Sequence, residues 1–186
     1  MISIQEMYAY SSSVRRRFAN KLSELPWEVV EKNREASFYS MKNILLHIID
    51  NEDWIVNWVI HDRSREYRRE KRSEEYRSMK EVFAHLDEVE AKTRRYLDSV
   101  AGDSNRTELS RHVRFILQSG AEFDLSVEES LFQSFTEQLY HMGELIALLW
   151  QENIEPPKMQ WFWNNPRHAL QGNAEAVNPS TSAGNT

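Results

Sequence analysis

Two residues one helical turn apart carry the clearest chemical signal in the chain. Glu137 and His141 are separated by four positions, and on an α-helix such side chains project from one face, so that a carboxylate and an imidazole can reach the same point. His47 lies far upstream, in a different apolar stretch, and could complete the group from a second helix. Two histidines and one carboxylate are a ligand set for a divalent transition metal that leaves coordination positions open. If the three meet, a water or a substrate could be activated there.

Each of these residues also has a simpler interpretation. A single histidine on an apolar helix, such as His47, is more often a core residue hydrogen-bonded to a carbonyl group. Glu137 and His141 alone could be a pair on an exposed helix face, worth about 0.2–0.5 kcal/mol. However, the face that carries them also carries Leu145 and Leu148, so it should point toward the core or a cleft, where an unpaired carboxylate is costly. The joint occurrence of the three residues on two core-lining helices favours the metal site.

Four long helices should position these side chains. The pattern Ser-x-x-Glu, in which the serine and the glutamate satisfy each other's backbone N–H groups, occurs at Ser3, Ser78 and Ser126 and marks three helix starts. Ser40 is a suitable N-cap for a further helix. Apolar residues then recur every three to four positions, up to about Leu22, Val59, Leu97 and Glu152.

Composition limits the class of protein. The 186 residues fit one domain with a sizeable core, and 40% apolar and 28% charged residues are typical of a globular protein. A net charge of −6 argues against a nucleic-acid partner. The absence of cysteine excludes disulfides, thiolate zinc sites and cysteine nucleophiles, and it fits a cytoplasmic protein. No apolar run is long enough to span a membrane, and the first residues do not resemble a signal peptide.

The segment from Arg63 to Arg77 joins the second and third predicted helices. It holds seven basic and four acidic residues, so a phosphate or nucleic-acid contact is conceivable. The mixed signs and the acidic whole chain favour a solvated linker instead.

Two further segments lie outside the predicted helices. Residues 113–125, which contain a central Gly120, could form a short hairpin or an extended cover. The aromatic run Gln160-Trp-Phe-Trp163 should pack back on the helices or on a second subunit, because so many aromatic rings are unfavourable in water. From about Gln171 the chain is polar and aperiodic, which predicts a disordered tail. The spacing of Trp54, Trp58 and Trp150 favours packing in the core or at an interface over a ligand cage.

The chain also resembles a known group, the DinB-like superfamily of four-helix bundles, which is related to the YfiT-type hydrolases and the thiol-dependent transferases. The resemblance covers roughly residues 1–165. It is carried by the stretch Ser40–Trp54 around His47, and by the stretch Glu137–Pro157, in which the last helix ends before Pro-Pro. The family typically has one histidine in its second helix and a His-x-x-x-His pair in its last.

The resemblance implies an all-α fold, a four-helix bundle with long crossover connections, with residues 1–165 as the domain. Residues 166–186, beyond it, are assigned to the disordered tail. It implies a divalent metal ion, whether nickel, zinc, cobalt or iron. It also implies a small-molecule substrate, with a low-molecular-weight thiol as a candidate partner, and a homodimer. Matched residue by residue, His47 and His141 correspond to the first and last ligands of the family.

The important departure is Glu137, which stands where the family has its middle histidine. Glutamate is a competent ligand, but the occupied site becomes less positive by one charge, which lowers the Lewis acidity of the ion. Gly143 and Glu144 fit the family pattern, whereas Met142 replaces its usual arginine. Glu144 could orient the site or lie at its rim. Asp50 and Glu52 are weaker candidates, for which a solvated surface role is about as plausible.

Two classes of function remain open at this point. The first is a metal-dependent hydrolase or transferase in which His47, Glu137 and His141 hold the ion. The second is a non-catalytic, stress-related or structural bundle in which the same residues bind metal without turnover or form a buried hydrogen-bonded cluster. No zinc-protease, phosphate-loop or serine-hydrolase motif offers another chemistry.

Overall fold

The computed structural model describes residues 2–102, 106–117 and 119–164, apart from the side chain of Trp163. Most of this part of the chain is helical, which confirms the predicted all-α fold class. The four long helices are α1 (Ile4–Ser23), α3 (Met41–Asn57), α4 (Met79–Val100) and α6 (Val127–Gln151). Shorter helices are α2 (Trp27–Glu31), α5 (Thr107–Ser110) and α7 (Trp161–Asn164). None of the described helices is long and apolar enough to cross a membrane.

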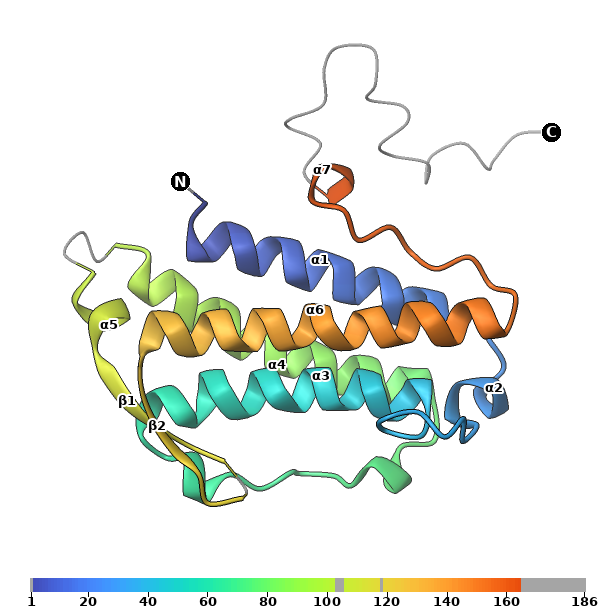
Figure 1. Cartoon of the computed structure of the whole chain (residues 1–186), viewed down its shortest axis with the longest axis horizontal. Coiled ribbons are helices and arrows are strands. Elements are labelled where there is room, and N and C mark those ends of the chain that lie inside the picture. Colours follow the sequence, from blue (N-terminus) through green and yellow to red (C-terminus); the bar gives the residue numbers. More distant parts are fainter. Residues whose placement is uncertain (1, 103–105, 118, 165–186) are drawn as a thin grey trace, which may run out of the picture.

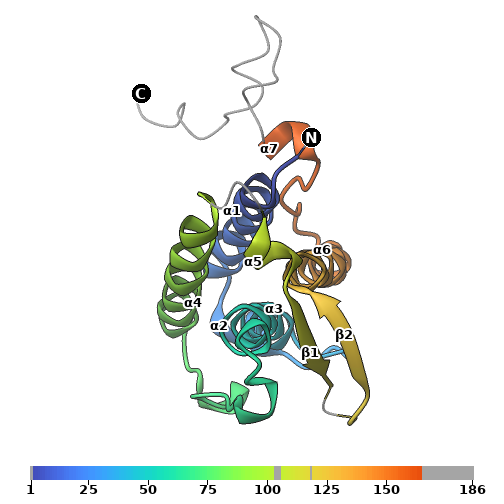
Figure 2. The ribbon, with the colours of Figure 1, turned by 90° about the vertical axis from the view of Figure 1, so that its left-hand side faces the viewer.

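The four long helices lie side by side and enclose a common core. Seen end-on, α1 and α3 occupy opposite corners and each packs against both α4 and α6 (Figure 2). Along the length of the molecule, α1 and α6 run in one direction and α3 and α4 in the other (Figure 1). Because α3 and α4 are parallel, the chain between them must return over the whole length of the helices.

The predicted helix starts are confirmed at all four serines. Each serine hydroxyl accepts a hydrogen bond from the backbone N–H three residues later. The capping boxes at Ser3 and Ser126 are complete, since the glutamates three positions on return the bond to the serine backbone. The box predicted at Ser78 is only half formed.

At that third helix start, the carboxylate of Glu81 does not turn back to Ser78. It pairs with Lys71 and accepts a hydrogen bond from the backbone N–H of Arg77 instead. The glutamate therefore ties the preceding connection to α4, because one of its carboxylate oxygens binds both the ammonium group of Lys71 and the backbone N–H of Arg77.

The connection of residues 58–78 holds three short 3₁₀ turns, Val59–His61, Ser64–Glu66 and Ser73–Glu75, and runs beside α3 (Figure 1). Most of its charged side chains are exposed, as predicted for a solvated linker. Its tyrosines attach it to the helices: Tyr76 is buried, and the hydroxyl of Tyr67 donates to the backbone carbonyl of Asp50.

The hairpin between α4 and α6 confirms one of the two predicted alternatives. Strands β1 (His112–Ile116) and β2 (Glu122–Ser126) pair antiparallel, and Gly120 takes a positive φ of 85° in the turn, a conformation that glycine adopts at low cost. The ring of Phe115 packs edge-on against Trp54 at a centroid distance of 5.0 Å. The hairpin thereby covers one end of α3.

The core consists of two apolar clusters, one at each end of the helices, with a charged junction between them. In this junction the fully buried guanidinium of Arg15 on α1 pairs with Glu52 on α3 and with Glu90 on α4, at 2.8 Å for the second pair. It also donates to Gln138 on α6 at 3.0 Å. One polar side chain from each long helix therefore meets the others at one point, an arrangement that the sequence pattern did not predict.

Beyond α6 the chain folds back along α1. The ring of Trp161 in α7 lies 4.9 Å from that of Tyr10, so this residue of the aromatic run packs on the helices, one of the two predicted alternatives, whereas Phe162 is exposed. The predicted tail, residues 166–186, lies outside the described residues. Trp150 lies outside the core, with an exposed fraction of 56%, so an interface role for it stays a prediction, and Trp54 lines a cleft.

Candidate metal centre

The structure brings His47, Glu137 and His141 together. One ligand atom from each lies within 4.8 Å of the others. The Nε2 atom of His141 is 3.0 Å from Oε1 of Glu137, and Nε2 of His47 is 3.7 Å from the same oxygen. In the described part of the chain, this is the one group of three or more His, Asp or Glu residues with such spacing.

Local structure explains why these side chains meet. Glu137 and His141 lie one turn apart on α6, and α6 packs against α3, which carries His47. The two imidazoles are nearly perpendicular, with ring centroids 4.6 Å apart. Phe38, in the segment before α3, stacks on His47 at 4.1 Å and meets His141 edge-on. The aromatic ring shields one side of the group and restricts the rotation of His47.

Glu144 orients the group from behind. Its Oε2 atom is 2.8 Å from Nδ1 of His141, on the side of the ring opposite to Glu137, and it also accepts a hydrogen bond from the hydroxyl of Ser37 at 2.8 Å. A carboxylate on the far nitrogen of an imidazole fixes the ring and makes the near nitrogen more basic. Of the two roles left open for Glu144, the structure thus shows the orienting one.

The environment of His47 suits a metal ligand. Its Nε2 atom is buried and forms no hydrogen bond within the described residues. Burial and the nearby His141 lower the pKa of His47, and together they outweigh the opposing effect of Glu137. A neutral imidazole with a free lone pair suits metal coordination. The donor set and this orphaned nitrogen therefore fit a divalent ion.

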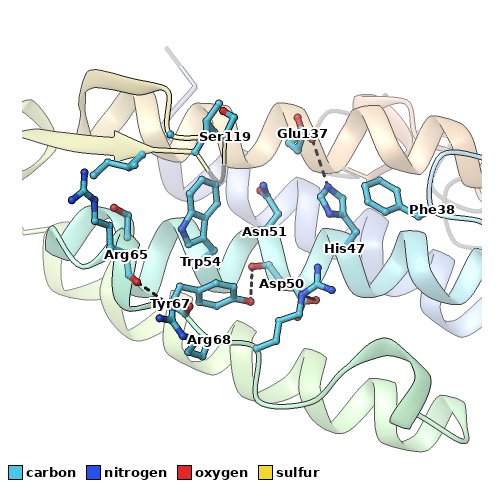
Figure 3. A pocket seen from close by; sticks show the side chains of 15 residues that line it. Phe38, His47, Asp50, Asn51, Trp54, Arg65, Tyr67, Arg68, Ser119 and Glu137 are labelled. Atoms are coloured by element: carbon cyan, nitrogen blue, oxygen red, sulfur yellow. Dashed lines mark hydrogen bonds and ion pairs between the residues drawn. The ribbon is translucent and has the colours of Figure 1, made fainter.

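A cleft of about 890 Å³ opens beside the group and is lined by His47 and Glu137 at one end (Figure 3). Its other walls come from α3, from residues 64–69 of the long connection and from the tip of the hairpin. Lining side chains include Asn51, Trp54, Tyr67, Arg68 and Leu117. A small molecule bound in this cleft would have direct access to the histidine–carboxylate group.

The two weaker candidates have other roles, and the solvated surface alternative is wrong for both. Asp50 is buried and pairs with Arg69 and with His85, each at 2.9 Å. Glu52 is fully buried in the junction with Arg15 and accepts further hydrogen bonds from neighbouring helices. Neither joins the metal-ligand group.

The fold and this group of side chains together define a helical protein with a histidine–carboxylate cluster at the end of a cleft. A sequence model of the DinB family matches residues 1–170, so the chain belongs to the DinB family. The comparison with curated proteins found no match.

Proposed function

We propose that the protein is a divalent-metal-dependent hydrolase or thiol-dependent transferase that acts on a small molecule. His47, Glu137 and His141 would hold the ion, for which nickel, zinc, cobalt and iron are the candidates. The observation that carries the proposal is the convergence of these three ligand atoms within 4.8 Å at the end of a cleft, together with a buried nitrogen of His47 that forms no hydrogen bond to any described residue.

A bound ion would supply Lewis acidity for the activation of a water or a thiol. The chain itself supplies the remaining functions. Glu144 holds His141 in place, and Phe38 keeps one side of the site apolar. Since Glu137 brings a negative charge where relatives have a histidine, the charge of the ion is partly neutralised, and the site should suit substrates that need moderate rather than strong polarisation.

The first test is elemental analysis of untagged wild-type protein by inductively coupled plasma mass spectrometry, beside the variants Glu137→Gln and His141→Ala. His112→Ala is the matched control, because this histidine is exposed on β1 and pairs only with Asp124 among the described residues. We expect about one equivalent of metal in the wild type and in the control, and none in the two site variants. Metal-free wild-type protein after reconstitution with each of the four ions would refute the proposal.

A second candidate function is a non-catalytic bundle, and one observation favours it. Glu137, His141, Glu144 and Ser37 form a continuous chain of hydrogen bonds with one another. In that case the cluster is structural, and His141→Ala should mainly lower the melting temperature of the metal-free protein. A metal-free melting temperature unchanged by His141→Ala would exclude this alternative.

A further inference from the structure

One face of α3 forms the floor of the cleft. His47, Asn51 and Trp54 follow one another at intervals of four and three residues, so they share this face, and all three line the cleft. Seven residues separate His47 from Trp54, which corresponds to about 10 Å along the helix axis. A molecule that extends from the histidine–carboxylate group to the far end of the cleft must be at least of this length.

The middle and far parts of the floor are suited to a flat body. Trp54 is held by Phe115 of the hairpin and presents a half-buried ring, while Ile116 and Leu117 add an apolar wall from the hairpin side. Between Trp54 and His47, the Oδ1 atom of Asn51 is buried and has no hydrogen-bond partner within the described residues. An apolar ring system with one polar substituent near its centre would satisfy both features.

Three arginines reach the cleft from the long connection, and they differ in their partners. Arg65 pairs with Glu122 at 2.8 Å and Arg69 pairs with Asp50 at 2.9 Å. Arg68 has no carboxylate partner in the part of the chain that the structure describes. Its Nη1 atom donates to the backbone carbonyls of Arg65 and Tyr67, at 3.1 and 2.7 Å.

These two bonds hold the guanidinium of Arg68 in a defined place while leaving its charge uncompensated. In Figure 3, Arg65 and Arg68 lie at the end of the cleft away from His47 and Glu137, and Trp54 lies between these two ends. The cleft therefore has a histidine–carboxylate end, an apolar centre and a cationic end. Guanidinium groups bind carboxylates, sulfonates and phosphates through paired N–H donors.

We propose that the substrate of this cleft is a small organic anion with a flat apolar body, whose acidic group is bound by Arg68 and whose body lies on Trp54. The proposal rests on the proposed function, because it places the opposite end of that molecule at His47 and Glu137. It adds a substrate class that the metal-ligand group alone does not indicate.

The test uses two fluorescent probes with the same rings. 8-Anilinonaphthalene-1-sulfonate carries an anionic group, and N-phenyl-1-naphthylamine is its neutral counterpart. Both are titrated into the full chain and into Arg68→Gln. Arg77→Gln is the matched control, since Arg77 is an exposed arginine of the same connection that does not line the cleft. We expect Arg68→Gln to weaken binding of the anionic probe about tenfold, the effect of one charge-assisted contact, with less than about a twofold change for the neutral probe.

Two further measurements decide the position and the kind of ligand. Trp54→Ala should weaken both probes, because both would lie on this ring. Naphthalene-1-acetate should displace the anionic probe, whereas glutathione, an anionic thiol without an apolar body, should not. Equal effects of Arg68→Gln and Arg77→Gln, or displacement by glutathione alone, would overturn the proposed substrate class.

The probe titrations, set beside the metal content of the wild type, separate this proposal from the metal centre. Retained, Arg68-dependent binding in a wild type that takes up no metal would refute the metal-dependent function and leave the anion site. A wild type that holds metal but shows no dependence on Arg68 would refute the anion site and leave the metal centre.

Discussion

Replacing Glu144 by alanine should weaken metal binding although Glu144 is not itself a proposed ligand. Its carboxylate is hydrogen-bonded to Nδ1 of His141 at 2.8 Å, so it fixes the ring with Nε2 facing Glu137. Without it, the ring can rotate. The loss should appear in the affinity for the ion rather than in the number of ions bound.

The expected loss of metal affinity follows from the hydrogen bond between Glu144 and His141 and from the exposure of the Glu144 side chain. Removal of such an outer carboxylate typically lowers metal affinity by about 10- to 100-fold. The side chain of Glu144 is 25% exposed, so water can partly replace it, and we expect the lower half of this range. A decrease of about 10- to 30-fold corresponds to about 1.4–2 kcal/mol of binding free energy.

The assay is a competition for Zn²⁺ against a chromophoric chelator at pH 7, with wild type, Glu144→Ala, Glu144→Gln and Ser37→Ala. Glu144→Gln keeps an acceptor oxygen but loses the charge, so its affinity should be intermediate, and Ser37→Ala should have a smaller effect. Glu88→Ala is the matched control, because Glu88 is half-exposed on α4 and pairs with Lys92. If Glu137→Gln no longer binds Zn²⁺ but Glu144→Ala binds it with an affinity within twofold of that of the wild type, Glu144 does not orient His141.

The remaining predictions concern the ligand set, the charged junction and the oligomer. Glu137→His should still bind about one equivalent of metal by elemental analysis, since it restores the three-histidine set of the family, and loss of the ion would contradict the assignment of this position. Arg15→Met should lower the free energy of unfolding by about 3–5 kcal/mol in urea titrations, because it leaves Glu52 buried without its cation and removes one of the cations paired with Glu90, and a loss below about 1 kcal/mol would contradict this. Glu90 should make the protein acid-labile: burial raises its pKa, but the ion pairs with Arg15 and Arg16 outweigh burial and bring it below the usual 4.5. This contribution to stability is therefore present above about pH 4.5 and is lost as the pH falls through the lowered pKa, so Glu90→Gln should flatten the acid limb of a melting-temperature profile. Light scattering of the predicted homodimer should give twice the chain mass of 22.1 kDa, and the mass of a single chain would refute it.

The sequence predicted the parts of the fold that depend on local patterns. Serine N-caps and apolar stripes located the four long helices to within a few residues, because capping and amphipathic periodicity are properties of neighbouring residues. The convergence of His47 with Glu137 and His141 was also predicted, from spacing within α6 and from the resemblance. The capping box predicted at Ser78 did not form completely, because the carboxylate of Glu81 pairs with Lys71, a contact that the local sequence pattern does not include.

The charged junction was missed because charge alone suggests a surface position. A signal was nevertheless present in α1: Tyr8, Ser12 and Arg15 fall on one helical face together with Ala19 and Leu22, and all five are buried. An arginine on such a face needs acidic partners on the helices opposite. Which glutamates provide them depends on how the helices align, which one sequence does not reveal.

The charged junction determines how the four long helices align along their axes. Apolar helix faces tolerate sliding by one turn, about 5.4 Å, because one leucine can replace another in the contact. The guanidinium of Arg15 contacts Glu52, Glu90 and Gln138 at once, so it does not tolerate such sliding. If one helix moved by a turn, a buried charge would be left without its partner in the apolar interior. Gln138 directly follows Glu137, and Glu52 lies five residues after His47 on α3. The junction therefore fixes the alignment of α3 and α6, because any other alignment would break the ion pairs of Arg15. The same alignment sets Glu137 opposite His47, so the geometry of the candidate metal centre depends on buried ion pairs that are not part of it.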